Sequence, residues 1–203
     1  MLEIEMKFRV ADAAKYEKSV KELLGVSFGQ ESVERDEFFR CDALGFPNEG
    51  KMLRIRRRGS FLAATFKGPR LDDSTKTREE IELPLVVPAA GSSPIRDALV
   101  DRTRGDWTRF FTRLGFEPAE FVEKTRRRTH VEYGGRNFEI SLDSLEGLGV
   151  FTEIETIAQE GDFEEAREMV KELAERLGLV DSIVKSYLAL KLEAATGRSV
   201  DEK

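Results

Sequence analysis

Charged and apolar residues alternate with a period of two along much of this 203-residue chain. Near the N-terminus, Glu3, Glu5 and Lys7 occupy every second position, and apolar residues fill the positions between them. Successive side chains of a β-strand point to opposite faces, so this spacing is typical of a strand with one ionised and one apolar face. We therefore expect residues 2–10 to form a strand that packs its apolar face beneath amphipathic helices.

The same alternation returns further along the chain, but acidic and basic residues lie in different segments. The basic positions are Arg54, Arg56 and Arg58, then Lys67, then Lys124, Arg126 and Arg128, and the acidic ones are Glu80, Glu82, Glu139, Asp143, Glu153 and Glu155. Alternation alone is also expected of an antiparallel sheet with one face in water. Like charges about 6.5 to 7 Å apart along a strand repel unless a counter-ion lies between them, so the segregation favours a face that binds ligands.

Apolar residues at helical spacing predict helices in other parts of the chain. Residues 12–25 and 162–177 each carry such a stripe before a glycine that can end a helix. Asp162 and Glu165 have the spacing of a capping box at the start of the second helix. The further expectations are a shorter helical piece at 106–115, a helix start at Ser93 and Pro94, and a C-terminal helix after Ser182.

Composition limits the class of protein. With 40% hydrophobic and 35% charged residues, the chain fits one domain, which we place at residues 1–194, before a polar tail at 195–203. The net charge of -6 argues against a general nucleic-acid-binding protein, and a single cysteine and a single histidine argue against a disulfide or a zinc site. Without a signal peptide or an apolar run of about 18 residues, we expect a cytoplasmic protein with no membrane or nucleic acid as partner. Uncovered apolar strand faces would favour a homodimer.

The two kinds of charged segment require two kinds of ligand. Mg²⁺ binds carboxylate oxygens and keeps part of its coordination shell for water and substrate phosphates. Arg and Lys bind phosphate oxygens, Arg in bidentate fashion. A closed barrel of about eight strands is about the smallest that holds a small ligand, and about eight extended segments occur here. A barrel with its ionised faces turned inward therefore predicts a metal-bound polyphosphate as the ligand.

A series of short motifs in a fixed order spans about residues 2–190. The motifs are E-x-E-x-K at Glu3, Glu5 and Lys7, LRIRR at 53–57, TFKGP at 65–69, R-x-E-x-E at Arg78, Glu80 and Glu82, K-x-R at Lys124 and Arg126, Asp143 in SLDSLEG, E-I-E at Glu153 and Glu155, and KSYLAL at 185–190. The series resembles the signature of the CYTH domains, also called triphosphate tunnel metalloenzymes. That family includes class IV adenylyl cyclases and thiamine triphosphatases.

The resemblance implies an α+β fold, in which a closed eight-stranded antiparallel β-barrel forms a tunnel with helices packed on the outside. It also implies an enzyme that uses Mg²⁺ or Mn²⁺ and acts on a nucleoside triphosphate or inorganic triphosphate. The implied metal ligands are Glu3, Glu5, Glu80, Glu82, Asp143, Glu153 and Glu155, with the choice between Glu80 and Glu82 left open. The implied triphosphate-binding residues are Arg54, Arg56, Lys67, Arg78, Lys124 and Arg126, and the implied catalytic residues are Lys7, Lys185, Glu5 and Glu153.

The resemblance leaves the reaction open between two nucleophiles. The stretch LDSLEGLGVFTEIE is similar to class IV adenylyl cyclases, which implies conversion of ATP to cyclic AMP and pyrophosphate. If water attacks instead, the enzyme is an inorganic, nucleoside or thiamine triphosphatase. A non-catalytic polyphosphate-binding module is a third interpretation, but it leaves the acidic strands without a role. Relatives tend to read D-x-Y-Y-D where this chain has Arg40 at the second acid, and this departure leaves the substrate detail open.

Overall fold

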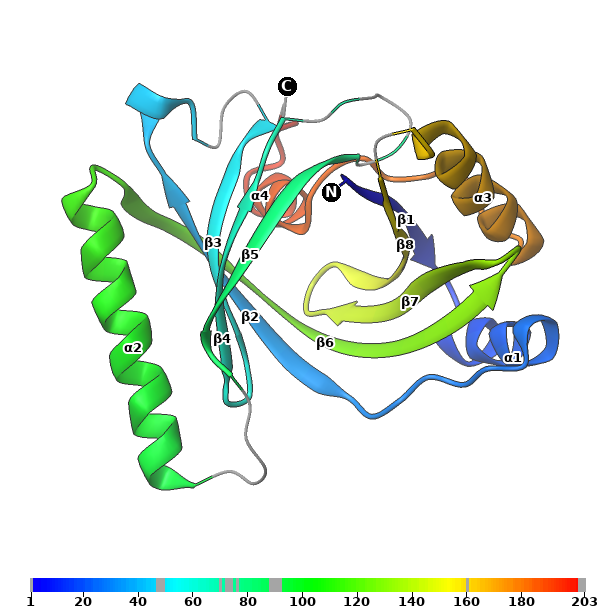
Figure 1. The fold of residues 1–203 in the computed structure, drawn as a ribbon, viewed down its shortest axis with the longest axis horizontal. Helices are drawn as coiled ribbons and strands as arrows, with labels where there is room; N and C mark the ends of the chain where they lie inside the picture. Colours follow the sequence, from blue (N-terminus) through cyan, green and yellow to red (C-terminus); the bar gives the residue numbers. More distant parts are fainter. Residues whose placement is uncertain are drawn as a thin grey trace. The chain divides into compact units, whose positions relative to one another are not determined.

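The fold is a closed barrel with helices packed on its outside (Figure 1). The computed structural model describes residues 2–46, 50–69, 71, 75, 77–87, 93–159 and 161–200. The strands are β1 (Leu2–Val10), β2 (Ser32–Arg40), β3 (Met52–Arg58), β4 (Phe61–Lys67), β5 (Arg78–Val86), β6 (Glu117–Tyr133), β7 (Arg136–Leu145) and β8 (Gly149–Ala158). They follow the order β1-β5-β4-β3-β2-β6-β7-β8, and the registered pairs are antiparallel. The predicted closed, eight-stranded antiparallel barrel is confirmed.

Side chains that the sequence supplies cap the start of two helices of the described chain. The helices are α1 (Ala13–Leu24), α2 (Pro94–Arg113), α3 (Phe163–Arg176) and α4 (Tyr187–Thr196), with a short 3-10 helix, η1 (Asp42–Leu44). The Asp12 carboxylate accepts a hydrogen bond from the Lys15 backbone N–H at 3.0 Å, and Gly25 ends α1 with a left-handed φ of 72°. The Ser93 hydroxyl oxygen caps α2 by accepting from the backbone N–H of Arg96.

Three local expectations about the helices were wrong. α2 is one continuous helix, because the start at Ser93 and the piece at 106–115 belong to the same element. The Asp162 side chain makes no capping bond to α3, since it accepts hydrogen bonds from Arg136 and from the Gln159 backbone N–H. The C-terminal helix begins at Tyr187, because the residues before it bind β1, where the Ile183 N–H donates to the Lys7 carbonyl oxygen at 2.7 Å.

The chain forms two compact units, each built from segments that are separate in the sequence. The first unit comprises Met1–Ser32, Arg70–Glu79 and Lys124–Ser186, and the second comprises Val33–Pro69, Glu80–Glu123 and Tyr187–Lys203. In the first unit, Ile4, Ile140 and Ile154 of the strands pack against Val20 of α1 and Val170 of α3, and all five are fully buried. The helices therefore cover the apolar face of β1, β7 and β8, as the alternation predicts.

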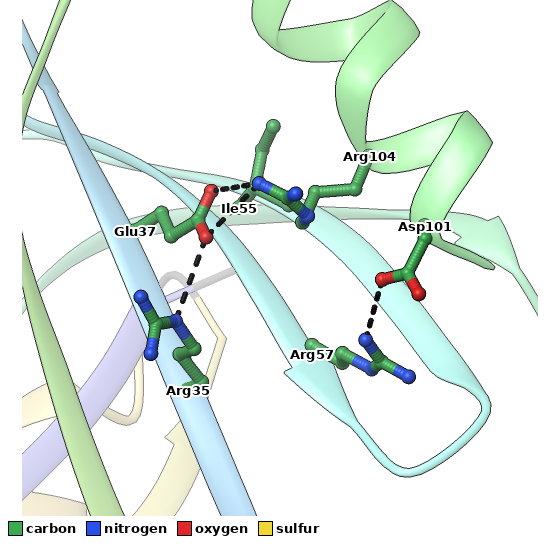
Figure 2. A pocket seen from close by; sticks show the side chains of 6 residues that line it. All are labelled: Arg35, Glu37, Ile55, Arg57, Asp101 and Arg104. Carbon is green, nitrogen blue, oxygen red and sulfur yellow. Dashed lines mark hydrogen bonds and ion pairs between the residues drawn. The ribbon is translucent and has the colours of Figure 1, made fainter. Parts of the chain in front are cut away.

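The core of the second unit lies where α2 packs against the outer face of the strands. Ile55, Leu62, Val100 and Phe111 are its buried centre, and Trp107 packs against its edge. Ion pairs attach the same helix to the strands, as Figure 2 shows. The pairs are Arg104 with Glu37 at 3.1 Å and Arg57 with Asp101 at 2.6 Å, and together with Arg35 and Ile55 these residues line a surface cavity of about 330 Å³. The charges around this cavity are matched by neighbours of opposite sign.

Several expectations about the whole chain stay predictions. Among the described residues, no helix has the length and apolar composition needed to cross a membrane. Ile81 and Leu83 on β5 are exposed, so the expected homodimer has apolar side chains available to it. α4 extends to Thr196, and the last three residues of the predicted tail, 201–203, lie outside the described residues.

Candidate active site

The ionised residues of the first unit lie on the strand face opposite α1 and α3. We call this the inner face, since in a closed barrel the face opposite the outer helices lines the interior. Its residues are buried although they are charged, with 1% of Lys7, 6% of Glu5 and 0% of Asp143 exposed. The strand register sets the inner-face residues in rows, which are Glu139, Glu155 and Glu5, then Arg128, Ser141, Glu153 and Lys7, then Arg126 and Asp143. The first row therefore holds carboxylates alone, and in the next two rows basic and acidic residues lie side by side.

Three carboxylates form a cluster at the acidic end of this face. Glu3, Glu5 and Glu155 each offer one oxygen, and these oxygens all lie within 4.8 Å of one another. Burial raises the pKa of the Glu155 carboxyl well above its usual range, and the charges of Glu3, Glu139 and Glu5 raise it further, while Arg126 opposes them. Oxygen donors at this spacing suit a hard divalent cation such as Mg²⁺ or Mn²⁺. The cluster fits the metal that the motifs predict.

Lys7 is held at the centre of the inner face by an acid and by the backbone of the C-terminal segment. Its Nζ lies 3.3 Å from Glu153 Oε1 and donates to the Lys185 carbonyl oxygen at 3.2 Å. The Lys185 backbone, rather than its ammonium group, therefore makes this contact with Lys7. Because the Ile183 N–H binds the Lys7 carbonyl oxygen, the segment before α4 is attached to β1 at the residue that carries the ammonium group.

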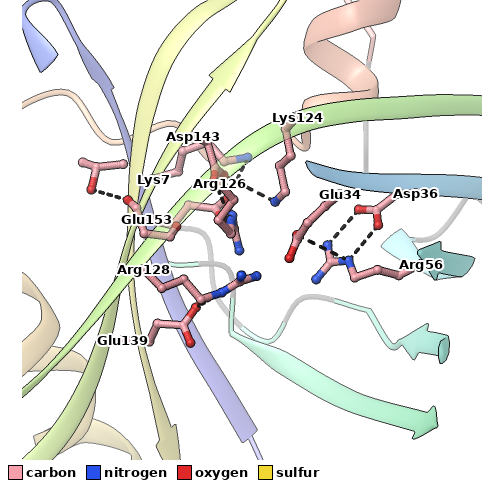
Figure 3. A network of polar contacts seen from close by, with 12 residues as sticks. Lys7, Glu34, Asp36, Arg56, Lys124, Arg126, Arg128, Glu139, Asp143 and Glu153 are labelled. Atoms are coloured by element: carbon pink, nitrogen blue, oxygen red, sulfur yellow. Dashed lines mark hydrogen bonds and ion pairs between the residues drawn. The ribbon is translucent and has the colours of Figure 1, made fainter. Parts of the chain in front are cut away.

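Arg126 connects two carboxylates on neighbouring strands, as Figure 3 shows. Its guanidinium donates to Asp143 on β7 and to Glu153 on β8, and Lys124 Nζ lies 3.3 Å from the same Asp143 carboxylate. Burial by itself raises the pKa of Asp143, but the positive charges of Lys124 and Arg126 outweigh it and hold that pKa below its usual value. Arg128 donates to Glu139 at 2.7 Å. These cations bind carboxylates that a phosphate could replace.

Arg78 opens β5 and pairs in register with Glu3 of the acidic cluster. Only 8% of Arg78 is exposed, and among the described residues its Nε has no hydrogen-bond partner. A buried guanidinium donor without an acceptor is costly, because it has lost its hydration. Its position therefore fits an anionic ligand close to the acidic cluster.

The second unit has its own charged face, on the side of β2 to β5 opposite α2. Arg56 donates to both oxygens of Asp36 at 2.7 Å (Figure 3). Arg54 also donates to Asp36, at 3.1 Å. Glu34, of which 0% is exposed, lies 3.8 Å from both Arg56 and Arg58. The arginine row that the sequence predicts on β3 is therefore matched by an acidic pair on β2.

Glu80 and Glu82 share the charged face of β5 but have different neighbours. Glu80 forms ion pairs with Lys67 and, at 3.6 Å, with Arg54, whereas Glu82 accepts a hydrogen bond from the Thr65 hydroxyl at 3.3 Å. Among the described residues, the Nε of Arg54 has no hydrogen-bond partner. Glu80 is thus engaged by two cations, and Glu82 by a neutral donor.

The structure groups the predicted site residues differently from the motifs. Glu3, Glu5 and Glu155 lie together as a candidate metal site. Asp143 and Glu153, also predicted as metal ligands, bind cations instead. Their metal-binding role stays a prediction, and so do the roles of Glu80, Glu82 and the phosphate-binding residues.

Sequence reasoning assigned no role to the acids of β2. Glu34 and Asp36 are spaced two apart, which is the signal already used for the other strands. Arg40, the departure from the family pattern, is exposed and forms an ion pair with Glu117 at 2.7 Å. Trp107 packs edge-on against Phe110 on α2, as expected of a core residue.

Comparison with known proteins shows the family. A family model described as the CYTH domain matches residues 1–187, and the chain belongs to this family. A protein of Methanocaldococcus jannaschii, provisionally named an adenylate cyclase, is 29% identical over 194 residues, which cover 94% of this chain and 99% of that protein. A solved protein of Pyrococcus horikoshii is 31% identical with a TM-score of 0.69, over 94% of this chain and 98% of the other.

A plant protein has the same fold at lower sequence identity. This protein from Hippeastrum is provisionally called an adenylyl cyclase, and its structure is described as revealing a dominant triphosphatase activity. It is 15% identical with a TM-score of 0.62, covering 100% of this chain and 98% of its own. At that identity the likeness shows the fold alone.

Proposed function

We propose that this protein is a divalent-metal-dependent enzyme that acts on a triphosphate, and that it converts ATP to cyclic AMP and pyrophosphate. The observation that carries the proposal is the division of charge on the inner face of the first unit. Glu3, Glu5 and Glu155 gather at one end, and Lys124 and Arg126 lie at the other. A metal–triphosphate complex is the ligand that presents a cation to the first group and phosphate oxygens to the second.

The acidic cluster would hold the metal ion. Glu3, Glu5 and Glu155 supply oxygen donors, and the pKa of Glu155 is raised first by burial and then by repulsion from its acidic neighbours, which a bound cation would offset. When bound, Mg²⁺ or Mn²⁺ neutralises phosphate charge and aligns the reacting groups. Asp143 and Glu153 would coordinate the metal ion only if they first released Lys7, Lys124 and Arg126, with which they now form ion pairs.

Each unit, taken by itself, has cations that would suit phosphate oxygens. In the first unit these are Lys124, Arg126 and Arg78, and in the second they are Arg54, Arg56 and Lys67. The buried Nε atoms of Arg78 and Arg54, which have no hydrogen-bond partner among the described residues, support this role. A phosphate that replaced carboxylates as partner would keep these guanidinium groups hydrogen-bonded, in the bidentate geometry that Arg favours.

In the proposed cyclisation, the 3′ oxygen of ATP bonds to the α-phosphorus as its proton passes to solvent water. The bond from the α-phosphorus to the bridging oxygen breaks, and pyrophosphate leaves with the bonding electrons. Lys7 and Arg126, which both contact Glu153, would stabilise the negative charge on the phosphoryl oxygens. The Lys185 carbonyl oxygen holds the Lys7 ammonium group in place for this task.

Hydrolysis of the terminal phosphate is the second candidate reaction. The same charged residues would hold inorganic triphosphate or another triphosphate, and water would attack the terminal phosphorus. One observation favours this candidate. Trp107, the single tryptophan, packs on α2 against Phe110 and Phe111, so it offers no platform for adenine on the charged face.

A product assay tests the proposal. Purified protein is incubated with ATP, GTP, thiamine triphosphate or tripolyphosphate, each with Mg²⁺ or Mn²⁺, and cyclic nucleotide, pyrophosphate and phosphate are separated. We expect cyclic AMP and pyrophosphate from ATP, with turnover lost in Glu5→Gln and kept in Glu146→Gln, which changes an exposed acid. Phosphate alone would establish the second candidate, and the absence of metal-dependent turnover with every substrate would overturn both.

A further inference from the structure

Ser141, the first residue of the SLDSLEG motif, carries a buried hydroxyl group on the inner face. The family resemblance assigns no role to this hydroxyl. Only 2% of the residue is exposed, and among the described residues its Oγ has no hydrogen-bond partner. A serine hydroxyl can donate one hydrogen bond and accept others, and leaving it buried without a partner is unfavourable. Alanine or another apolar residue would fill the same position without burying an unpaired hydroxyl group.

The strand register places this hydroxyl among the charged groups of the site. Ser141 pairs with Arg128 on β6 and with Glu153 on β8, and both neighbours have their side chains on the inner face. Arg126 on β6 reaches Glu153 on β8, so its side chain crosses β7, the strand that carries Ser141. A phosphoryl oxygen bound by Arg126 or Arg128 would therefore come close to the Ser141 hydroxyl.

The backbone of Ser141 is fixed from the opposite side of the sheet. Its carbonyl oxygen accepts a hydrogen bond from the Thr152 hydroxyl at 2.8 Å, and the Thr152 oxygen is bonded in turn to the Tyr16 hydroxyl at 2.9 Å. These buried bonds hold the strand at Ser141 without using its side chain. Less conformational entropy is lost when a ligand binds a preorganised donor than when it binds a mobile one.

From this placement we infer that the Ser141 hydroxyl donates a hydrogen bond to a phosphoryl oxygen of the bound triphosphate. The inference rests on the proposed function, since it names a further substrate-binding residue of the same face. It assigns Ser141 a contact with the phosphate chain, which inorganic triphosphate and nucleoside triphosphates share. The hydroxyl therefore contributes to affinity for the triphosphate group rather than to recognition of a base.

The test compares Ser141→Ala with Ser144→Ala, an exposed serine of the same strand. Tripolyphosphate binding is measured by calorimetry in EDTA, where metal-dependent turnover is excluded, and the melting temperature of the free protein is recorded for each variant. We expect Ser141→Ala to weaken binding roughly tenfold, as for loss of a hydrogen bond to a charged group. The melting temperature of the free variant should be unchanged or higher, because an unpaired buried hydroxyl has been removed. Ser144→Ala should match the unaltered protein in both measurements.

Three other results would contradict either the inference about Ser141 or the proposed function. Equal affinity of Ser141→Ala and the unaltered protein would exclude the contact with phosphate. A fall of several degrees in the melting temperature of free Ser141→Ala would show that the hydroxyl stabilises the fold, and this too would overturn the inference. If the unaltered protein binds tripolyphosphate neither in EDTA nor in the presence of Mn²⁺, the proposed function itself fails.

Discussion

Glu5 and Glu155 lie directly opposite one another on β1 and β8, and both carboxyl side chains are buried or half-buried. Glu3 brings a third carboxylate to the same place. Like charges opposite one another destabilise a sheet, and burial strengthens their repulsion. The folded chain therefore holds these groups together at a cost in stability, which a bound cation would remove.

Replacing Glu155 by glutamine should separate metal binding from folding. The change replaces one buried, titratable carboxyl group of the cluster at nearly constant shape, so the melting temperature of the free protein should stay the same or rise. We expect Mn²⁺ to raise the melting temperature of the unaltered protein, because ligands that bind the folded state stabilise it by mass action, and we expect Glu155→Gln to lose this increase. Differential scanning fluorimetry with a Mn²⁺ titration measures both effects.

Glu146→Gln is the matched control for Glu155→Gln, because it makes the same chemical change at an exposed position. It should keep the full stabilisation by Mn²⁺. If Glu155→Gln also keeps it, the cluster of Glu3, Glu5 and Glu155 is not the metal site.

Removing the guanidinium of Arg126 should destabilise the free protein strongly. Arg126→Ala leaves the buried carboxylates of Asp143 and Glu153 without their shared partner, and breaking a buried ion pair in this way costs about 3 to 5 kcal/mol. Arg127→Ala removes a half-buried arginine that binds Glu17 on the outer side, and should cost about 1 kcal/mol or less. Urea unfolding compares the two. Similar losses would mean that the inner-face network contributes no more than a surface ion pair.

Neighbouring arginines of β3 should differ in their effect on triphosphate binding. Arg56→Ala removes a charged donor from the charged face of the second unit and should weaken tripolyphosphate binding by about 1.5 to 3 kcal/mol. Arg57 faces α2 and binds Asp101, so Arg57→Ala should leave the affinity unchanged. Titration calorimetry on both variants is the measurement, and equal affinities for Arg56→Ala and the unaltered protein would remove Arg56 from the site.

Stability should fall in alkaline solution through the ionisation of Tyr16. Burial raises the pKa of its hydroxyl from 10.0 to about 12, although the hydrogen bond to Thr152 lowers it. Between these pH values the unfolded chain loses the proton and the folded chain keeps it, so the free energy of unfolding decreases as the pH rises. The decrease attributable to Tyr16 is about 2 to 3 kcal/mol.

Tyr16→Phe should flatten this dependence between about pH 10 and pH 12. Urea unfolding at a series of pH values measures this dependence in Tyr16→Phe and in the unaltered protein. An equal slope in the two proteins would contradict the assignment.

The faces of the strands could be predicted from the sequence, because alternation is a local property of the backbone. Glu5 and Lys7 lie on one face and Ile4 on the other wherever β1 is placed. The same argument correctly separated Arg56 from Arg57. Periodicity also located α1 and α3, whose apolar stripes pack on the strands.

The partners of these faces could not be predicted, because they depend on pairing between distant segments. Spacing within β7 and β8 does not reveal that Arg126 reaches both Asp143 and Glu153. The acids of β2 were missed as partners of the β3 arginines for the same reason. The start of α4 was placed too early, because the bond from the Ile183 N–H to the Lys7 carbonyl oxygen holds the segment before Tyr187 against β1.

The central claim is that the acidic cluster holds a divalent cation and that the buried cations hold phosphate. Anomalous diffraction from crystals grown with Mn²⁺ and tripolyphosphate tests it most directly, since it locates the metal without reference to activity. The account predicts an anomalous peak bound by Glu3, Glu5 and Glu155, with phosphate density in contact with Arg126. A peak elsewhere, or phosphate density that avoids Arg126 and Lys124, would contradict it.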